Sequence, residues 1–270
     1  MQPAPVLISG AGPSGLLLAL WLSKYSVPFR IVDKALTPFE TSRAVVVHAR
    51  TLEIYRMLGI AGDIQNAGTQ VLRSVINSEG RRKGHFDLSH GGKGQTYYPF
   101  VLSVTQDEHE AVLLNHLEKV GGQVERGVEV VGVVSPADND SNGNMKVTLR
   151  SVKSGKEEIV AASYTIGCDG AHSGVRHAAG VAMEGGTYSR GFFVADVILH
   201  GDMQTQGEIN VCLAQNEFVL ILALPHKTNR ARLIGFVPEA CKELGDVSFE
   251  DCRPSIAKAA PRVTVDEVRW

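Results

Sequence analysis

The sequence predicts an α/β fold followed by a part that is rich in β-sheet, and three patterns support this prediction. The chain opens with a short apolar strand, Val6–Ser9, an apolar helix that ends near Lys24, and a second strand, Phe29–Val32. Three later segments resemble antiparallel strands joined in series, at 123–134, 145–151 and 157–162. Beyond Gly186, four more strand-like segments follow, at 192–199, 208–213, 217–224 and 231–237. The opening order forms a parallel βαβ unit, whereas the later strands form antiparallel sheets.

A glycine-rich turn joins the first strand to the first helix. It carries the pattern G-x-G-x-x-G as Gly10, Gly12 and Gly15. The first glycine allows the tight turn, the second lets a pyrophosphate approach the backbone, and the third lets the helix pack closely on the sheet. The helix N-terminus, with Pro13 and Ser14 in its first turn, offers unpaired N–H groups to phosphates. This stretch predicts a dinucleotide site.

An acid stands where such a site needs one. Asp33 lies 23 residues after Gly10, close to the usual spacing of about 20 for a carboxylate that accepts hydrogen bonds from ribose hydroxyls. Lys34 follows it directly and belongs to the predicted site. The alternative is a structural glycine turn in another kind of α/β unit. The pattern alone does not distinguish one dinucleotide from another.

The remaining elements follow from periodicity and turn residues. We expect helices at 49–58, 61–66, 107–120 and 249–259, and a helix or turn at 171–179. We expect further strands at 71–77, 82–88, 98–104 and 164–170. The basic run Arg81–Lys83 is expected at a solvated hairpin tip.

Composition excludes several classes of partner. The 270 residues are 44% hydrophobic and 21% charged, with a net charge of −2, so nothing favours nucleic acid or an anionic membrane surface. The apolar run Leu16–Leu22 is far too short to span a bilayer. The four cysteines lack metal-ligand spacing, and we interpret them as reduced thiols of a cytoplasmic protein without a metal site.

Three motifs resemble those of the FAD-dependent aromatic hydroxylases, the class A flavoprotein monooxygenases that include phenol and p-hydroxybenzoate hydroxylases. The first is GAGPSG with Asp33. The second, SRAVVVHARTLEIYRMLG at residues 42–59, resembles the family's arginine loop and the helix after it. The third, GCDGAHSGVR at residues 167–176, resembles the family's DG motif. The motifs stand in the family's order, and the resemblance covers the whole chain.

The resemblance implies roles for several positions. Arg43 would contact the FAD pyrophosphate through its planar guanidinium, the alternative being a surface arginine in a loop. Gln106 would reach the ribityl chain. Asp169 would face the cofactor and Gly170 would let the backbone approach it, the alternative being an ordinary turn at a strand end.

The resemblance also implies the architecture. It implies an FAD-binding, Rossmann-like domain of the glutathione-reductase type with an inserted β-meander, at 1–69 and 105–186. The sheet-rich substrate domain would occupy 70–104 and 187–270. Phe192, Phe193, Val194, Phe218 and Leu220 are candidates for the substrate pocket or for the core.

The reaction that the family performs is aromatic hydroxylation. In it, NADPH or NADH reduces FAD, and one atom of O₂ passes to an aromatic or phenolic substrate, for which a secondary metabolite is one candidate. The cofactor carries the difficult chemistry in such enzymes. The sequence contains no residue that we can assign as a general base, so the catalytic residues stay unassigned.

The chain departs from the family at its C-terminal end. Family members carry a GD segment that contacts FAD, after the region matched by Val263–Trp270, and this sequence has none there. We therefore expect the substrate domain to be C-terminally incomplete. The chain could be a fragment, or a shortened homologue whose open edge a second copy or a partner chain covers. It could also be a redox-inactive homologue that acts as a binding module or a non-redox catalyst.

Overall fold

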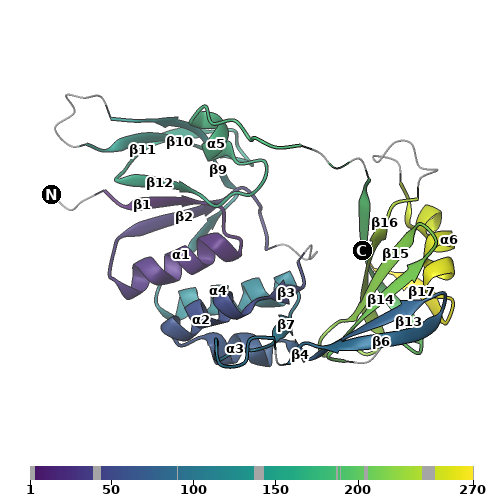
Figure 1. The fold of residues 1–270 in the computed structure, drawn as a ribbon. Helices are drawn as coiled ribbons and strands as arrows, with labels where there is room; N and C mark the ends of the chain where they lie inside the picture. The colour runs from purple at the N-terminus through teal and green to yellow at the C-terminus, as the bar shows by residue number, and fades with distance from the viewer. Residues whose placement is uncertain are drawn as a thin grey trace. The chain divides into compact units, whose positions relative to one another are not determined.

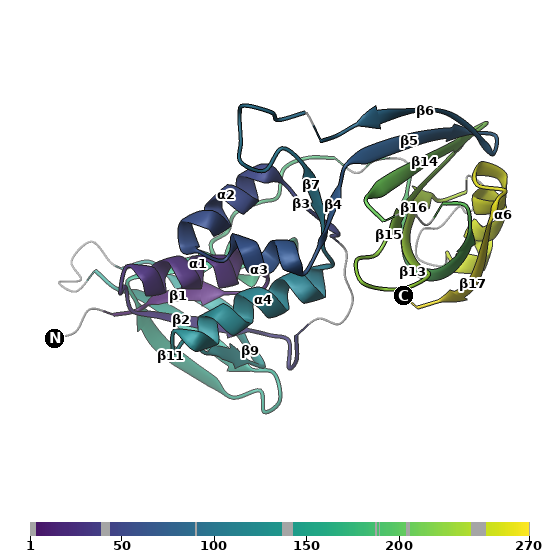
Figure 2. The ribbon, with the colours of Figure 1, turned by 90° about the horizontal axis from the view of Figure 1, so that it is seen from below.

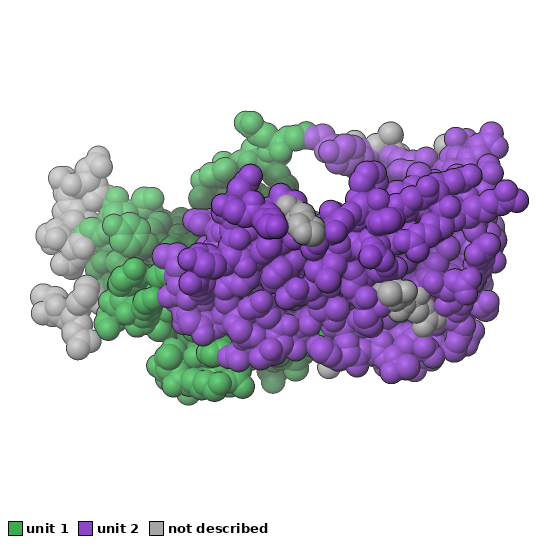
Figure 3. Space-filling view, turned by 60° about the horizontal axis from the view of Figure 1, so that its bottom comes forward, with its two compact units in different colours: residues 1–40, 107–185 green, residues 41–106, 186–270 purple. Residues whose placement is uncertain are grey.

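A computed structural model describes residues 4–38, 44–89, 91–136, 143–186, 188, 190–203, 206–238 and 247–269 (Figures 1 and 2). The chain divides into two compact units, coloured separately in Figure 3. Unit 1 comprises residues 1–40 and 107–185, and unit 2 comprises residues 41–106 and 186–270. The boundaries of the functional domains stay a prediction, since residues 41–69 belong by their contacts to unit 2.

Unit 1 is built on a parallel sheet of four strands in the order β12-β1-β2-β8. These strands are β1 (Val6–Ser9), β2 (Phe29–Asp33), β8 (Val124–Arg126) and β12 (Tyr164–Gly167). All four residues of β1 are buried, as expected for a central strand of a parallel sheet. The helices α1 (Pro13–Lys24) and α4 (Gln106–Lys119) lie on one side of this sheet (Figures 1 and 2).

The opposite side of the parallel sheet is covered by the predicted antiparallel meander. Its strands are β9 (Val128–Val134), β10 (Met145–Ser151) and β11 (Glu157–Ala162), in the order β11-β10-β9. Leu7 and Val32 of the parallel sheet share a buried apolar cluster with Val130, Val147 and Leu149 of the meander. The short helix α5 (Gly174–Ala178) packs against β9.

One predicted strand of unit 1 was wrong. Residues 123–134 do not form a single strand, because the chain turns at Gly127, which has a left-handed φ of +72°. Before the turn, β8 continues the parallel sheet beside β2, and after it β9 begins the meander. The pattern did not reveal this change of sheet because β8 has only three residues, too few to show a period of its own.

Unit 2 is built on a sheet of seven strands in the order β17-β13-β16-β15-β14-β5-β6. These are β5 (Arg73–Ser78), β6 (Arg81–Asp87), β13 (Phe192–Gly201), β14 (Glu208–Ala214), β15 (Glu217–Ala223), β16 (Arg230–Phe236) and β17 (Val263–Val268). The early hairpin β5–β6 joins the late strands through a parallel pairing of β5 with β14. The basic run Arg81–Lys83 begins the exposed edge strand β6, whereas the turn itself lies at Glu79 and Gly80.

A smaller sheet accompanies the helices of unit 2. Its strands are β3 (Val46–Val47), β4 (Thr69–Val71) and β7 (Val101–Ser103), and its neighbouring helices are α2 (Ala49–Leu58) and α3 (Ala61–Asn66). Both helices begin and end where the sequence predicts. The strands β3 and β4 were not predicted, because two or three residues are too few for an alternating pattern.

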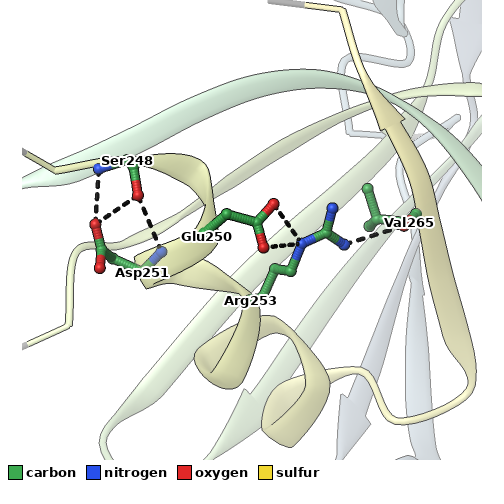
Figure 4. Close-up of polar contacts among 5 residues, drawn as sticks. All are labelled: Ser248, Glu250, Asp251, Arg253 and Val265. Carbon is green, nitrogen blue, oxygen red and sulfur yellow. Dashed lines mark hydrogen bonds and ion pairs between the residues drawn. The ribbon is translucent and has the colours of Figure 1, made fainter.

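One face of the seven-stranded sheet is covered by α6 (Phe249–Ala259), which packs on β14, β15 and β17. A capping box starts this helix: Asp251 N–H donates to Ser248 Oγ at 3.4 Å, and Ser248 N–H donates to Asp251 Oδ2 at 2.9 Å (Figure 4). Arg253 then donates to the carbonyl of Val265 at 3.0 Å, which ties the helix to the edge strand β17.

Candidate cofactor and substrate sites

The glycine turn after β1 has two positions where no other residue fits. Gly10 has a φ of +100°, and a Cβ there would lie 2.4 Å from the carbonyl oxygen of Cys168. A Cβ on Gly15 would lie 1.9 Å from the carbonyl oxygen of Gly10. Both distances are far below van der Waals contact. These two glycines therefore let β1, β12 and α1 approach one another closely.

The middle glycine is different, because the protein leaves space beside it. The nearest atom to a Cβ on Gly12 would be Oε1 of Glu110, at 3.9 Å. Gly12 is also the N-cap of α1, and no side chain of the described residues caps this helix. Pro13 lies in the first turn, where its nitrogen has no hydrogen and needs no hydrogen-bond partner. Ser14 is exposed, and no acidic residue of the first turn would repel a phosphate. The positive end of the helix dipole, which no side chain of the described residues caps, therefore lies at a position with room for one more atom beside the Glu110 side chain. A helix N-terminus of this kind suits a phosphate.

Asp33 ends β2 beside this turn. Its Oδ2 accepts from the Ala11 N–H at 2.6 Å, and its Oδ1 accepts from the Ala35 N–H at 2.7 Å. An ionised carboxylate has about four acceptor positions, so capacity for ligand hydroxyls remains. Arg126 of β8 lies opposite Asp33 in the sheet, with 3.9 Å between Nη1 and Oδ2. The sequence analysis did not identify Arg126, because a single charged residue at the end of a strand does not distinguish a site residue from a surface one. The predicted site residue Lys34 is exposed beside Asp33.

Asp169 follows β12 and holds the next turn together. Its Oδ2 accepts from Ser9 Oγ at 3.1 Å, from Gly174 N–H at 2.9 Å and from Val175 N–H at 3.3 Å. Burial raises the pKa of Asp169, but the hydrogen bonds to its carboxylate lower it by a larger amount. The pKa of Asp169 therefore lies below its ordinary value. The other oxygen, Oδ1, is buried and accepts no hydrogen bond from the described residues. Gly170 beside it is exposed and has a φ of +79°.

The parallel sheet brings most of the predicted site residues together. Because β1, β2 and β12 run in the same direction, their carboxyl ends lie at one edge of the sheet. The predicted residues at this edge are Gly10, Gly12, Pro13, Ser14, Gly15, Asp33, Lys34, Asp169 and Gly170. Gln106 is the first residue of α4 and belongs to unit 2, and Arg43 lies outside the described residues.

The predicted FAD site has a physical counterpart at this edge. An uncapped helix N-terminus and an open glycine suit the pyrophosphate, and a carboxylate on the second strand suits the ribose. The residues present therefore fit a dinucleotide such as FAD.

Unit 2 offers a different surface, on the sheet face opposite α6. Phe192, Phe236, Phe218 and Leu213 lie directly opposite one another across the adjacent strands β13, β16, β15 and β14. Ring centroids are 5.0 Å apart between Phe192 and Phe236 and 5.4 Å apart between Phe218 and Phe236. The next row on this face consists of Val194, Ile234, Leu220 and Val211. Every side chain of both rows is at least partly exposed, and Phe192 is 56% exposed.

The predicted pocket residues divide between the two faces of this sheet. Phe192, Val194, Phe218 and Leu220 belong to the partly exposed rows. Phe193 points to the other face, where a Cβ on Gly235 would lie 2.5 Å from its ring, and it packs on the buried core beneath α6. The period of two along β13 explains the division, since neighbouring residues point to opposite faces.

Comparison with known proteins agrees with this geometry. Residues 3–268 match the family model described as an FAD binding domain. The 6-methylpretetramide 4-monooxygenase of Streptomyces rimosus is 34% identical over 198 residues, which cover 73% of this chain and 34% of that protein. Pentachlorophenol 4-monooxygenase of Sphingobium chlorophenolicum is 29% identical over 272 residues, which cover 99% of this chain and 48% of that protein.

The fold is also found in solved structures. The flavin-dependent monooxygenase PieE, in complex with FAD and substrate, superposes with a TM-score of 0.80 at 23% identity, covering 99% of this chain and 49% of that one. The p-nitrophenol 4-monooxygenase PnpA of Pseudomonas putida DLL-E4 also has a TM-score of 0.80, at 21% identity over 99% of this chain and 67% of that one.

The chain belongs to this FAD-binding family, the class A flavoprotein monooxygenases. The predicted α/β fold with a sheet-rich second part is confirmed, and the cofactor of the family is FAD. The chain spans about half the length, or less, of the curated relatives named above. No helix among the described residues is long and apolar enough to cross a membrane.

Proposed function

We propose that this chain binds FAD and carries out the hydroxylation of an aromatic or phenolic substrate with NADPH or NADH and O₂. The observation that carries the proposal is the open, uncapped N-terminus of α1, with Gly12 at its start and Asp33 beside it. When bound, FAD supplies the transfer of electrons from the nicotinamide to O₂ and of one oxygen atom to the ring. The chain's own residues bind the cofactor, orient the ring and exclude water.

Each cofactor residue has a proposed part. The N–H groups at the start of α1 hold the pyrophosphate, and Asp33 accepts from the ribose of the ADP half. Gln106 reaches the ribityl chain, Asp169 faces the cofactor, and Gly170 lets the backbone approach it. Arg43 pairs with the phosphates, which is a role that the family resemblance supports.

The proposed substrate is a flat aromatic molecule. Its support is the two half-exposed apolar rows on the open face of the unit 2 sheet, which offer aromatic and branched aliphatic side chains over four strands. Aromatic rings pack well against such surfaces, in offset or edge-on arrangements. The relatives named above are called monooxygenases of 6-methylpretetramide and of pentachlorophenol, which agrees with this class of substrate.

Titration of the purified protein with FAD tests the proposal. We expect quenching of flavin fluorescence with the wild-type chain, and a loss of affinity of more than ten-fold, about 1.4 kcal/mol, with Gly12→Val. The fold has room at Gly12, so this variant stays folded by circular dichroism. Gly62→Ala in α3 is the control, because a Cβ there meets no atom within 4 Å outside its own helix backbone. A wild-type protein that leaves FAD unquenched contradicts the proposal.

A second measurement separates the enzyme from a redox-inactive binding module. With FAD bound, NADPH or NADH is added under anaerobic conditions in the presence of a phenolic ligand, and flavin absorbance is followed. Bleaching supports the monooxygenase. An oxidised flavin with both nucleotides and a series of phenols supports the binding module or a non-redox catalyst.

The cellular setting also stays a prediction. We propose a cytoplasmic protein, which agrees with the absence of a disulfide at Cys168, Cys212 and Cys252 among the described residues. We also propose that a second copy of the chain, or a partner chain, covers an edge of the protein. Light scattering of the purified chain tests association with a second copy, and a monomer contradicts it.

A further inference from the structure

The open face of the unit 2 sheet changes character beyond its two apolar rows. Asp196 stands two residues after Val194 on β13, so the two side chains point to the same face. Its direct partner in the register of the sheet is Arg232 of β16. Arg232 Nε donates to Oδ1 of Asp196 at 2.7 Å, and Arg232 Nη2 donates to Oδ2 at 2.8 Å. A two-pronged ion pair therefore borders the apolar surface.

A segment far away in the sequence covers this third row unevenly. The carbonyl oxygen of Ala44 accepts from Arg232 Nη1 at 3.2 Å. Val45 shares a buried apolar cluster with Leu222, which lies opposite Arg232 on β15. Arg232 is 0% exposed and Leu222 is 2% exposed, whereas 19% of the Asp196 side chain stays exposed. The carboxylate therefore lies where the covered row meets the half-exposed apolar rows, and all five residues belong to unit 2.

The carboxylate of Asp196 can accept more hydrogen bonds than Arg232 donates to it. An ionised carboxylate has about four acceptor positions, and the guanidinium fills one on each oxygen. Among the described residues, no other group donates to this carboxylate. The side chains of the two apolar rows have no donor to offer. Within the described part of the chain, a further hydrogen bond to Asp196 therefore needs water or a ligand.

Stability alone is a poor explanation for a charge pair at this position. Burying two opposite charges costs about as much desolvation free energy as their attraction returns, and apolar residues of equal size often stabilise a core better. What the pair does provide is orientation. The planar guanidinium of Arg232 binds both oxygens of Asp196 at once and so holds the plane of the carboxylate beside the apolar rows.

We propose that Asp196 is a specificity-determining residue of the substrate surface: its carboxylate accepts a hydrogen bond from the hydroxyl of a phenol whose ring lies on the two apolar rows. This inference rests on the proposed substrate surface of unit 2. A site built around such a hydrogen bond rejects an analogue that lacks the hydroxyl hydrogen, because the acceptor then loses its partner. The hydroxyl also fixes the ring in rotation, so the same carbon of each substrate molecule is presented.

The test compares two probes, 2-naphthol and 2-methoxynaphthalene, which share a ring system and differ in the hydroxyl hydrogen. Their dissociation constants are measured by equilibrium dialysis against the purified chain in the presence of FAD. We expect the wild-type chain to bind 2-naphthol at least ten-fold more tightly, about 1.4 kcal/mol. In Asp196→Asn the ratio should fall below three-fold, because the amide oxygen faces Arg232 and the amide nitrogen cannot accept. The variant keeps the size of the side chain, so a steric effect of the methyl group would survive in it.

Two control variants separate the hydrogen bond from other effects. Asp202→Asn removes an exposed carboxylate just after β13, and both dissociation constants should stay as in the wild type. Val194→Ala removes apolar surface from the second row, so it should weaken both probes alike and leave their ratio unchanged.

The outcomes distinguish this role from the substrate surface itself. A wild-type ratio near one, or a ratio that survives in Asp196→Asn, overturns the role of Asp196. If Asp196→Asn does not fold because Arg232 loses its counter-charge, the double variant Asp196→Asn/Arg232→Gln takes its place, since it removes both charges together. A wild-type chain that binds neither probe overturns the substrate surface as well, whereas equal binding of both probes overturns only the role of Asp196.

Discussion

Gly10 and Gly12 stand two residues apart in one turn, yet a side chain at each has a different physical consequence. At Gly10 a Cβ would collide with the backbone of Cys168 and would have to adopt a φ of +100°. At Gly12 the nearest atom is 3.9 Å away. One glycine therefore serves the packing of the protein, and the other leaves space that the protein itself does not fill.

This difference leads to a prediction for Gly10→Ala. The substitution should lower the free energy of unfolding by several kcal/mol, since neither the neighbouring strand nor the φ angle can accommodate a methyl group. Urea denaturation of Gly10→Ala and Gly12→Ala measures the contrast. Gly12→Ala should lie within about 1 kcal/mol of wild type. Equal stability of the two variants would contradict the close approach of β1 and β12.

At the scale of elements, α4 carries a buried histidine in its first turns. His109 is 8% exposed, and burial lowers its pKa from about 6.5 to about 4, so it is neutral in the folded protein at neutral pH. Between these two values the unfolded chain binds a proton that the folded chain does not. Stability that is fully present above pH 6.5 is therefore lost as the pH falls toward 4.

The loss should be measurable. At pH 5 the free energy of unfolding should be lower by about 2 kcal/mol, because pH 5 lies roughly 1.5 pH units below the pKa of the histidine in the unfolded chain. Thermal melts at pH 7.5 and pH 5 should show a smaller decrease of Tm for His109→Gln than for the wild-type protein. His116→Gln, in the same helix and partly exposed, is the control and should follow the wild type. An identical pH dependence in all three proteins would show that His109 is not the titrating group.

Single elements also show where local patterns succeed. α2, α3 and α6 were predicted with their observed bounds. At α2, Leu52 and Tyr55 share the buried face and Gly59 ends the helix in a left-handed conformation, as the sequence indicates. The strand predicted at 123–134 was wrong because Gly127 redirects the chain between β8 and β9, which belong to different sheets. Such a redirection depends on which neighbour each strand finds, and that is a property of the whole sheet.

At the scale of the molecule, the family's cofactor should stabilise the chain by binding only its folded form. At a free FAD concentration of 100 times the dissociation constant, the expected gain is about 2.7 kcal/mol. A thermal melt with and without FAD measures it as an increase in Tm. Gly12→Val is the control and should gain at most about 1.4 kcal/mol at the same FAD concentration, because its affinity is at least ten-fold lower. A wild-type Tm that does not respond to saturating FAD would contradict a site formed only in the folded state.

The sequence by itself determined the βαβ opening, the glycine turn with Asp33, the DG motif and the family to which the chain belongs. These features are local: each depends on the spacing of residues within about 30 positions, and the backbone conformation that glycine allows is a property of one residue. Among the pocket candidates, the sequence could name Phe192 and Phe193 together but could not say which would be exposed.

Only the tertiary structure decided the contacts between distant segments. It placed Asp169 against Ser9, Arg126 opposite Asp33, and Arg232 between Asp196 and Ala44. It also assigned Phe192 to the open face of a sheet and Phe193 to the buried one. The physical reason is that strand order and register select these partners, and both emerge from the packing of elements up to 188 residues apart, as Ala44 and Arg232 are.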